Sequence, residues 1–306
     1  MLERSRLRVG CRELAVDPEE LEALDRRFRG NDAEPQIPVV GNGGISVTLR
    51  WRDGLVVKPL PDFPSRAVFE EYTAAIDAHV HALQQADVEV LSASVEALAR
   101  PDGSWAAYIV QPEIASPLLL AEWLRAHPAS EGLQLFDRLA GHVESAVAGR
   151  IGLDADVTNW CVDDGRLALL DISTPMLRDR KGRLAFDPTL FMQDLPRWFR
   201  PLARRYVQTF LVRRFFDRRL LFIDVLSGFK GEKLEGLLPE AVARASRNVL
   251  QPITEEDVER YRKRNERFWR AMGMLKRPVK TSNTGASHET PGIDRESNPS
   301  VRPGPS

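Results

Sequence analysis

A cluster of oxygen-bearing side chains lies within residues 151–174, and its spacing is the strongest chemical signal in the chain. Two short runs of strand-forming residues, 159–162 and 167–170, flank a turn that contains Asp164 and Gly165. Asp-Gly is a typical two-residue hairpin turn because both residues tolerate positive φ. The sequence therefore predicts a tight β-hairpin in the middle of this cluster.

The register of this hairpin decides which side chains meet at its open end. With this turn, Val162 faces Leu167, and Asn159 faces Leu170. Asn159 and Asp171 are then neighbours where the two strands begin and end. An amide oxygen and a carboxylate suit Mg²⁺, which takes few protein ligands and fills its shell with water and nucleotide phosphates. The spacing predicts a magnesium site with these two residues as ligands.

The same stretch resembles the catalytic loop of the protein-kinase-like superfamily, in particular its small-molecule branch of aminoglycoside and choline phosphotransferases. That branch has the pattern His-Gly-Asp, four residues, Asn, hairpin and Ile-Asp. Asp154, Asn159 and Asp171 match its three polar positions. Gly152 stands where the family has His, and residues 172–173 are Ile-Ser where protein kinases have Phe-Gly. The resemblance implies that Asn159 and Asp171 hold metal.

The resemblance also implies a general base, and two carboxylates compete for that role. Asp154 lies five residues before Asn159, as the catalytic Asp does in the family. Asp156 is a second carboxylate that can act as the base instead. The spacing favours Asp154.

A glycine-rich segment upstream is the candidate phosphate-binding element. Strand-forming residues 39–40 and 47–51 flank it, and a further turn at 52–54 leads into an apolar strand at 55–60. Glycines let backbone N–H groups approach phosphate oxygens closely, as in kinase glycine-rich loops. No Gly-Lys-Ser/Thr opens a helix here, so this is not a Walker A loop. The candidate nucleotide contacts are Gly41, Gly43, Gly44 and Ser46.

Lys58 lies inside the apolar strand 55–60, where a buried ammonium group needs a charged partner. The resemblance implies that it binds the α- and β-phosphates and pairs with a Glu on the next helix, which we predict over residues 65–81. Glu71 is the expected partner, with Glu70 as the alternative register. A competing interpretation is an edge-strand lysine that reaches solvent, because Pro59 follows it directly.

Residues 88–98 and 105–114 are predicted as two further strands, joined by a turn at 101–103. The resemblance places the hinge at residues 111–114, where backbone groups meet the adenine edge. Pro112 removes one N–H donor. Gln111, Glu113 and Ile114 are the remaining candidates for adenine contacts.

Helical apolar spacing follows over residues 117–126, 132–149, 234–250 and 254–275. Residues 191–226 are rich in arginine, from Arg197 to Arg219, and have apolar residues at helical spacing. Three interpretations of this helix stand: a solvated helix face, a site for an anionic substrate, or a nucleic-acid or membrane patch. Residues 276–306 contain almost no apolar residues, so we predict a disordered tail.

The bulk composition narrows the class of protein. The chain has 306 residues, 43% of them hydrophobic, which is enough to bury a substantial core. Its formal net charge of −1 gives no reason to expect nucleic acid as a partner. Cys11 and Cys161 match neither a disulfide framework nor a zinc site. No apolar run approaches the roughly 20 residues of a membrane span, and the N-terminus lacks a signal-peptide core, so we expect a cytoplasmic protein.

Taken in order, these features predict an α+β, bilobal, protein-kinase-like fold. We expect an N-terminal extension with a helix (1–35), an N-lobe of antiparallel sheet plus one helix (36–114), a mainly helical C-lobe (115–275) and the tail (276–306). The expected function is an ATP- and Mg²⁺-dependent phosphotransferase that acts on the hydroxyl of a small molecule. The alternative is a catalytically inactive nucleotide-binding or scaffold protein with an anionic partner at the arginine-rich helix.

Overall fold

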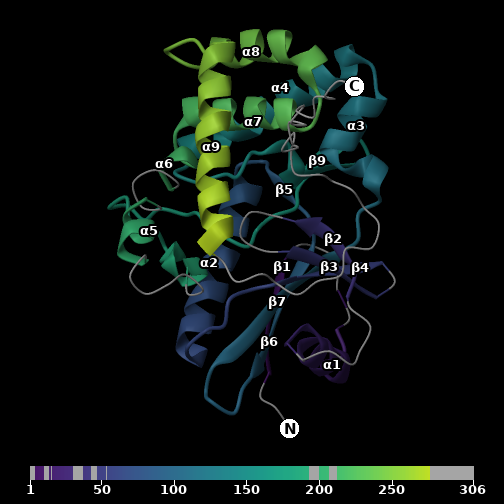
Figure 1. Ribbon diagram of the computed structural model, residues 1–306, viewed down its shortest axis with the longest axis vertical. Helices are drawn as coiled ribbons and strands as arrows, with labels where there is room; N and C mark the ends of the chain where they lie inside the picture. Colours follow the sequence, from purple (N-terminus) through teal and green to yellow (C-terminus); the bar gives the residue numbers. More distant parts are fainter. Residues whose placement is uncertain are drawn as a thin grey trace, which may run out of the picture.

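The computed structural model describes residues 4–9, 14, 16–29, 37–42, 47–52, 54–192, 200–206 and 212–275. The fold is α+β and bilobal, with a sheet lobe in the lower half of Figure 1 and a helical lobe in the upper half. The predicted tail at 276–306 lies outside the described residues, as do Gly43, Gly44 and Ser46.

The sheet lobe is built on a six-stranded antiparallel sheet with the order β1-β6-β7-β4-β3-β2. Its strands are β1 (Arg4–Val9), β2 (Val39–Asn42), β3 (Val47–Arg52), β4 (Leu55–Pro59), β6 (Ala93–Ala99) and β7 (Trp105–Pro112). β1 pairs with β6, so the predicted N-terminal extension supplies an edge strand of this sheet. β4 lies between β3 and β7, which rules out the interpretation of Lys58 as an edge-strand lysine.

A helix covers each face of this sheet. α1 (Pro18–Arg29) buries Leu21 and Leu24 on the face that carries Tyr108. α2 (Arg66–Gln85) buries Phe69 and Ile76 on the opposite face. Because successive strand side chains point to opposite faces, β6 and β7 meet apolar partners on both sides, and their residues are almost all buried.

A second, three-stranded sheet has the order β5-β9-β8. It lies between the large sheet and the helices of the upper lobe (Figure 1). β5 (Glu89–Val90) pairs in parallel with β9 (Arg166–Leu169), and β9 pairs with β8 (Trp160–Asp163). The predicted single strand at 88–98 is therefore wrong, because its first part leaves the large sheet and joins the hairpin of the other lobe.

The predicted hairpin register is confirmed. Val162 faces Leu167, and the N–H of Leu170 donates to the carbonyl of Asn159 at 2.8 Å. Asp164 has a φ of 47° and the following glycine 73°, as a two-residue turn with two left-handed positions requires.

The helical lobe packs around the buried helix α7 (Arg218–Gly231). Its other helices are α3 (Leu120–Ala126), α4 (Ala129–Ala148), α5 (Arg200–Tyr206), α6 (Val212–Arg214), α8 (Leu238–Arg247) and α9 (Glu255–Leu275). Short 3₁₀ turns are η1 (Ser116–Leu118), η2 (Val157–Asn159), η3 (Pro188–Met192) and η5 (Glu235–Leu237). None of the helices in the described ranges is long and apolar enough to cross a membrane.

The arginine-rich region is not one helix, as the apolar spacing predicted, but is divided among η3, α5, α6 and α7. Asp217 begins a new helix there, because its carboxylate accepts from the N–H of Leu220 at 3.1 Å. Several arginines pair within the lobe, including Arg204 with Asp187, Arg214 with Asp224, and Arg219 with Asp257. This internal pairing leaves less of the region's positive charge for an external anion.

Candidate functional site

Lys58 and Asp171 join the two lobes. The Nζ of Lys58 lies 2.5 Å from Oδ2 of Asp171 and 3.2 Å from the Oγ of Ser173. The other carboxylate oxygen of Asp171 accepts from the N–H of Ser173 at 2.9 Å. Burial works to raise the pKa of Asp171, yet the Lys58 charge and these hydrogen bonds together hold it below its usual value. This carboxylate is therefore anionic at neutral pH.

Ile172 fixes the segment that carries Asp171. Its side chain is 1% exposed and packs in the core beneath α2, although the residue follows the hairpin of the other lobe. On α2, the hydroxyl of Tyr72 donates to the carbonyl of Ser173 at 2.8 Å. The packing of Ile172 and the buried hydrogen bond to Ser173 thus hold the residues after Asp171 against the sheet lobe.

The predicted pairing of Lys58 with Glu71 or Glu70 is wrong. Glu71 is exposed on α2, and Glu70 pairs with Arg66 at 2.7 Å. The reason is the rotation of α2, which turns Tyr72 toward the sheet and both glutamates toward solvent. Asp171 takes the place of a helix glutamate as the partner of Lys58.

Asp154 lies in a loop that Asn159 closes. The Nδ2 of Asn159 donates to the carbonyl of Asp154 at 3.5 Å, which leaves the Oδ1 of Asn159 available as an acceptor. The Oδ1 of Asp154 is buried and has no hydrogen-bond partner in the described part of the chain. Burial raises the pKa of Asp154 to about 7; the Arg214 charge opposes this shift and the Asp224 charge adds to it.

Asp156 has a different role in the local structure. Its Oδ1 accepts from the N–H of Thr158 at 3.0 Å and from the Oγ1 of the same residue at 2.8 Å, which caps η2. Burial raises its pKa to about 6. One oxygen of Asp156 is therefore engaged in shaping the loop, whereas Asp154 has an oxygen without a partner.

Behind this loop lies a buried charge network that the sequence analysis did not identify. Arg214 lies 3.6 Å from the carboxylate of Asp224 and donates to the hydroxyl of Tyr261 at 3.1 Å. Asp224 is 2% exposed, and its Oδ2 has no partner among the described residues. The available signal was Asp224 itself, a carboxylate inside the apolar run 220–226 of α7.

Gly152 is the position where the family pattern has His. A Cβ there would lie 2.7 Å from the Cβ of Met176 and 2.8 Å from the ring of Phe216, so no side chain fits. His79 of α2 contacts this residue instead, and its Nε2 donates to the Gly152 carbonyl at 3.0 Å. Burial lowers the pKa of His79 to about 4, so the ring is neutral at pH 7. Sequence spacing gave no signal for this contact.

The predicted hinge is only partly free for a ligand. The N–H of Glu113 donates to the carbonyl of Gly54 at 2.8 Å, and its carboxylate accepts from the Nε of Arg50 at 2.9 Å. The N–H of Glu113 is thus not available for adenine, contrary to the prediction. Gln111 donates to the carbonyl of Leu170 at 2.8 Å, and Ile114 lines a hollow of about 250 Å³.

Gly41 is the only residue of the predicted phosphate-binding set upstream of Lys58 that falls in the described part of the chain. It lies in β2 opposite Thr48, and a Cβ at Gly41 would come within 3.3 Å of the Thr48 Cβ. That separation requires the neighbour to shift, so the close strand pairing itself favours glycine there.

The donor set is suited to Mg²⁺ rather than to a metal held by protein alone. No group of three or more His, Cys, Asp or Glu side chains converges on a metal position within the described ranges. Mg²⁺ requires only one or two carboxylates when phosphates and waters complete its shell. Asp171, kept anionic, and the Oδ1 of Asn159, for which no donor lies among the described residues, fit that requirement.

Comparison with known proteins adds a family assignment. No curated protein matches the chain. A solved structure described as "Glucosamine kinase (crystal form B)" is similar at 13% identity and a TM-score of 0.25, over 74% of this chain and 84% of that one. A similarity this low shows neither a common fold nor a common activity. The model of "Family of unknown function (DUF6206)" matches residues 23–278, so this chain belongs to that family.

Proposed function

We propose that the protein is an ATP- and Mg²⁺-dependent phosphotransferase that acts on a hydroxyl group of a small molecule. The observation that carries the proposal is the Lys58–Asp171 contact, in which a lysine from the centre of the sheet meets the aspartate after the hairpin of the other lobe. The kinase-like resemblance of the sequence predicts both residues. We place the N-lobe at 36–114 and the C-lobe at 115–275.

Asp171 and the Oδ1 of Asn159 would hold Mg²⁺, which neutralises charge that develops on the transferred phosphoryl group. Lys58 would move from the Asp171 carboxylate to the α- and β-phosphates when a nucleotide enters. Pro112 offers a carbonyl and Ile114 an N–H to adenine, whereas the Glu113 N–H is already bound. We propose that Gly41, Gly43, Gly44 and Ser46 line the phosphates.

Asp154 is the proposed general base. A catalytic base works best when its pKa lies near the working pH, and burial brings the pKa of Asp154 to about 7. Its partnerless Oδ1 can accept the proton of an acceptor hydroxyl. Asp156, which already caps η2, is the less suitable of the two carboxylates. We propose a cytoplasmic location, where ATP is available as the phosphoryl donor.

The test is incubation of the protein with ATP, Mg²⁺ and a broad panel of small alcohols, amino alcohols and sugars. We expect release of ADP together with one phosphorylated product, and dependence of both on Mg²⁺. Absence of ADP and of product across the panel contradicts the proposal. Analysis of each reaction by mass spectrometry identifies the acceptor.

A second candidate function is a catalytically inactive nucleotide-binding protein. Two observations favour it: Gly152 excludes the histidine of the family pattern, and Glu70 and Glu71 do not pair with Lys58. Thermal-shift titration with ATP separates the two functions. Stabilisation by ATP that is equal with and without Mg²⁺, in a protein that gives no turnover, supports the second candidate.

A further inference from the structure

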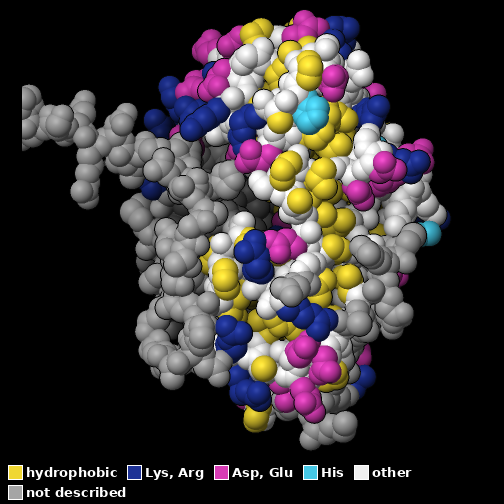
Figure 2. Space-filling model, turned by 90° about the vertical axis from the view of Figure 1, so that its right-hand side faces the viewer, with side chains coloured by type: hydrophobic (Ala, Val, Ile, Leu, Met, Phe, Trp, Pro, Cys, Tyr) yellow, Lys and Arg dark blue, Asp and Glu magenta, His cyan; other side chains and the backbone are white. Residues whose placement is uncertain are grey.

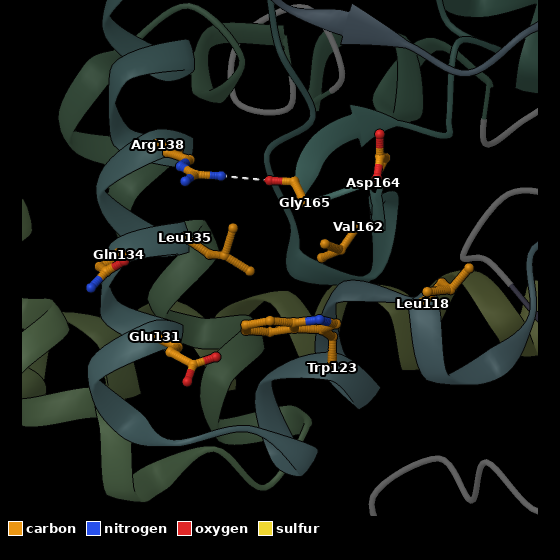
Figure 3. Close-up of a pocket in the computed structure, with 9 residues that line it drawn as sticks. All are labelled: Leu118, Trp123, Glu131, Gln134, Leu135, Arg138, Val162, Asp164 and Gly165. Carbon is orange, nitrogen blue, oxygen red and sulfur yellow. Dashed lines mark hydrogen bonds between the residues drawn. The ribbon is translucent and has the colours of Figure 1, made fainter.

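Two adjoining hollows form a groove on the helical lobe that reaches the end of β7. One has a volume of about 410 Å³ and lies between α3, α4 and the turn of the hairpin (Figure 3). The other has a volume of about 250 Å³ and adjoins the end of β7. Leu118 and Val162 line both. We call the two hollows together the hairpin groove.

The floor of the hairpin groove is apolar. Trp123 lies below Val162, Leu135 lies beside it, and Leu118 closes the opposite side (Figure 3). Leu118 is 40% exposed, and apart from Leu250 no large hydrophobic side chain is as open to solvent in the described part of the chain. The ring of His127 stacks on Trp123 at 3.7 Å, which fixes the plane of the indole.

Figure 2 shows the side of the molecule that lies at the right of Figure 1, where α3 is. Hydrophobic side chains run in a stripe down this face of the molecule, with charged groups along both edges. Leu91, Pro112 and Ile114 continue the lining of the groove toward the sheet lobe. A contiguous apolar surface rimmed by polar groups is typical of an interaction site.

The carboxylates at the rim of the groove differ from most others in the helical lobe because they lack a basic partner among the described residues. Most carboxylates of this lobe pair with arginine, as Asp137 and Glu240 do with Arg244. Three carboxylates at the groove have no basic partner among the described residues: Glu131, Asp163 and Asp164. Arg138 is a basic side chain of the rim, and it donates to the carbonyl of Gly165 at 2.5 Å. The groove therefore has an excess of negative charge around an apolar floor.

We propose that the hairpin groove binds an extended peptide segment of a partner protein, one that combines Lys or Arg with Leu, Ile, Val or an aromatic residue. The apolar side chain fills the hollow over Trp123, and the basic side chains face Glu131, Asp163 and Asp164. The excess of negative charge at the rim disfavours nucleic acid and anionic membranes as occupants. This proposal does not require phosphotransfer, although Pro112 and Ile114 line the groove and also carry the backbone groups proposed for adenine.

The probe is a phage-displayed library of random dodecapeptides, selected against the immobilised full chain. We expect the recovered sequences to be enriched in Lys and Arg beside apolar residues. A synthetic copy of one such peptide then gives dissociation constants by fluorescence anisotropy. Recovery of no peptide, or of acidic or wholly polar peptides, contradicts the proposal.

Leu118→Glu is the main variant, since it places charge in the apolar centre at a residue already open to solvent. We expect binding to weaken by about 30-fold or more, as for a central anchor position. Asp77→Lys on the exposed face of α2 is the matched surface control and should leave binding unchanged. Equal binding by Leu118→Glu and wild type overturns the proposal.

Charge reversal tests the rim independently of folding. Glu131→Lys and Asp163→Lys should each weaken binding by about 3- to 10-fold, less so at high salt. A second peptide has glutamate in place of its basic residues. The Glu131→Lys variant should bind this acidic peptide more tightly than the wild-type protein does, and a misfolded variant would not show that gain. Analytical ultracentrifugation tests a second copy of this chain as the occupant. A wild-type dimer that becomes a monomer in Leu118→Glu overturns the proposal, because the groove then binds a second copy of the chain.

Discussion

The two ends of the candidate site shift the pKa of a carboxylate in opposite directions. At the end near the sheet, Asp171 has the Lys58 ammonium and the N–H of Ser173 as partners, and its pKa lies below the usual value. At the end near α7, Asp154 has an oxygen without a partner, and its pKa rises to about 7. Both carboxylates are half-buried, and desolvation acts to raise the pKa of both, so their partners make the difference.

This difference separates two chemical tasks. A carboxylate that stays charged at every physiological pH suits binding of a cation, whereas one that titrates near pH 7 suits proton transfer. The arrangement also has a cost in stability at the second end, because a desolvated charge without partners destabilises the folded state. Substitutions at one end of the site should leave the other end intact.

The largest effect is expected for Asp171→Asn. The substitution keeps the size of the side chain but removes the anionic ligand, so turnover of the proposed reaction should be abolished. Lys58 also loses its partner, and the melting temperature should fall. Steady-state kinetics and thermal denaturation measure the two effects, with Asp77→Asn as an exposed control. Unchanged turnover in Asp171→Asn removes this residue from the metal site.

Asp154→Asn should lower kcat by about 10²- to 10⁴-fold, the range for loss of a general base, with little change in nucleotide affinity. Asp156→Asn should cost much less, because its main contact is the cap on η2. The reverse order of the two variants identifies Asp156 as the base.

The same Asp154→Asn variant gives a stability test that needs no substrate. The folded-state pKa of about 7 lies above the ordinary value of 3.8, so the charged carboxylate destabilises the fold fully above pH 7. That penalty declines as the pH falls from 7 toward 4. Asp154→Asn should therefore be more stable than wild type at pH 8, by about 1–3 kcal/mol, and nearly equal to it at pH 4. A pH-independent difference contradicts the raised pKa.

Tyr72→Phe removes one buried hydrogen bond and keeps the ring packing against Phe63 and Phe186. The carbonyl of Ser173 then lacks its partner, which should cost about 1–3 kcal/mol of unfolding free energy. Urea denaturation measures this loss. Tyr72 contacts the segment after Asp171 and not the loop of Asp154. The stability difference that Asp154→Asn produces in the wild-type protein should therefore persist in the Tyr72→Phe variant.

The smallest effect concerns His79. Its folded-state pKa of about 4 lies below the ordinary 6.5, so the neutral ring contributes stability above pH 6.5 that is lost as the pH falls toward 4. His79→Gln can keep an N–H donor toward Gly152 without a titrating ring. Relative to wild type, this variant should become more stable as the pH falls through that window. Parallel stability curves for the two proteins contradict the lowered pKa.

Local chemistry explains what the sequence could predict. The turn dipeptide at 164–165 and the alternation around it determine the hairpin register, and the register places Asn159 and Leu170 opposite each other. Lys58 in an apolar strand requires a charged partner, and the structure supplies one in Asp171. These inferences depend on neighbours in sequence and on the period of a strand, both visible in one chain.

The remaining features depend on tertiary packing. Which of Glu70, Glu71 and Tyr72 faces the sheet follows from the rotation of α2, and that rotation is decided by how its apolar face meets β6 and β7. The contact of Arg214 with Asp224 likewise brings two helices together. The rotation of α2 has no local signature, and Asp224 in an apolar run signals a buried carboxylate without identifying Arg214 as its partner.

The pairing of β5 with β9 has a mechanical consequence. The chain passes between the lobes at β5 and again after β7, and the N–H of Leu91 donates to the carbonyl of Leu169 at 2.9 Å at the first crossing. Sliding of one lobe past the other would break this ladder. Rotation would meet a second obstacle, because Ile172 packs in the core beneath α2 and the hydroxyl of Tyr72 donates to the carbonyl of Ser173. The segment after Asp171 therefore fastens the helical lobe to the sheet lobe at a point distant in sequence from β5.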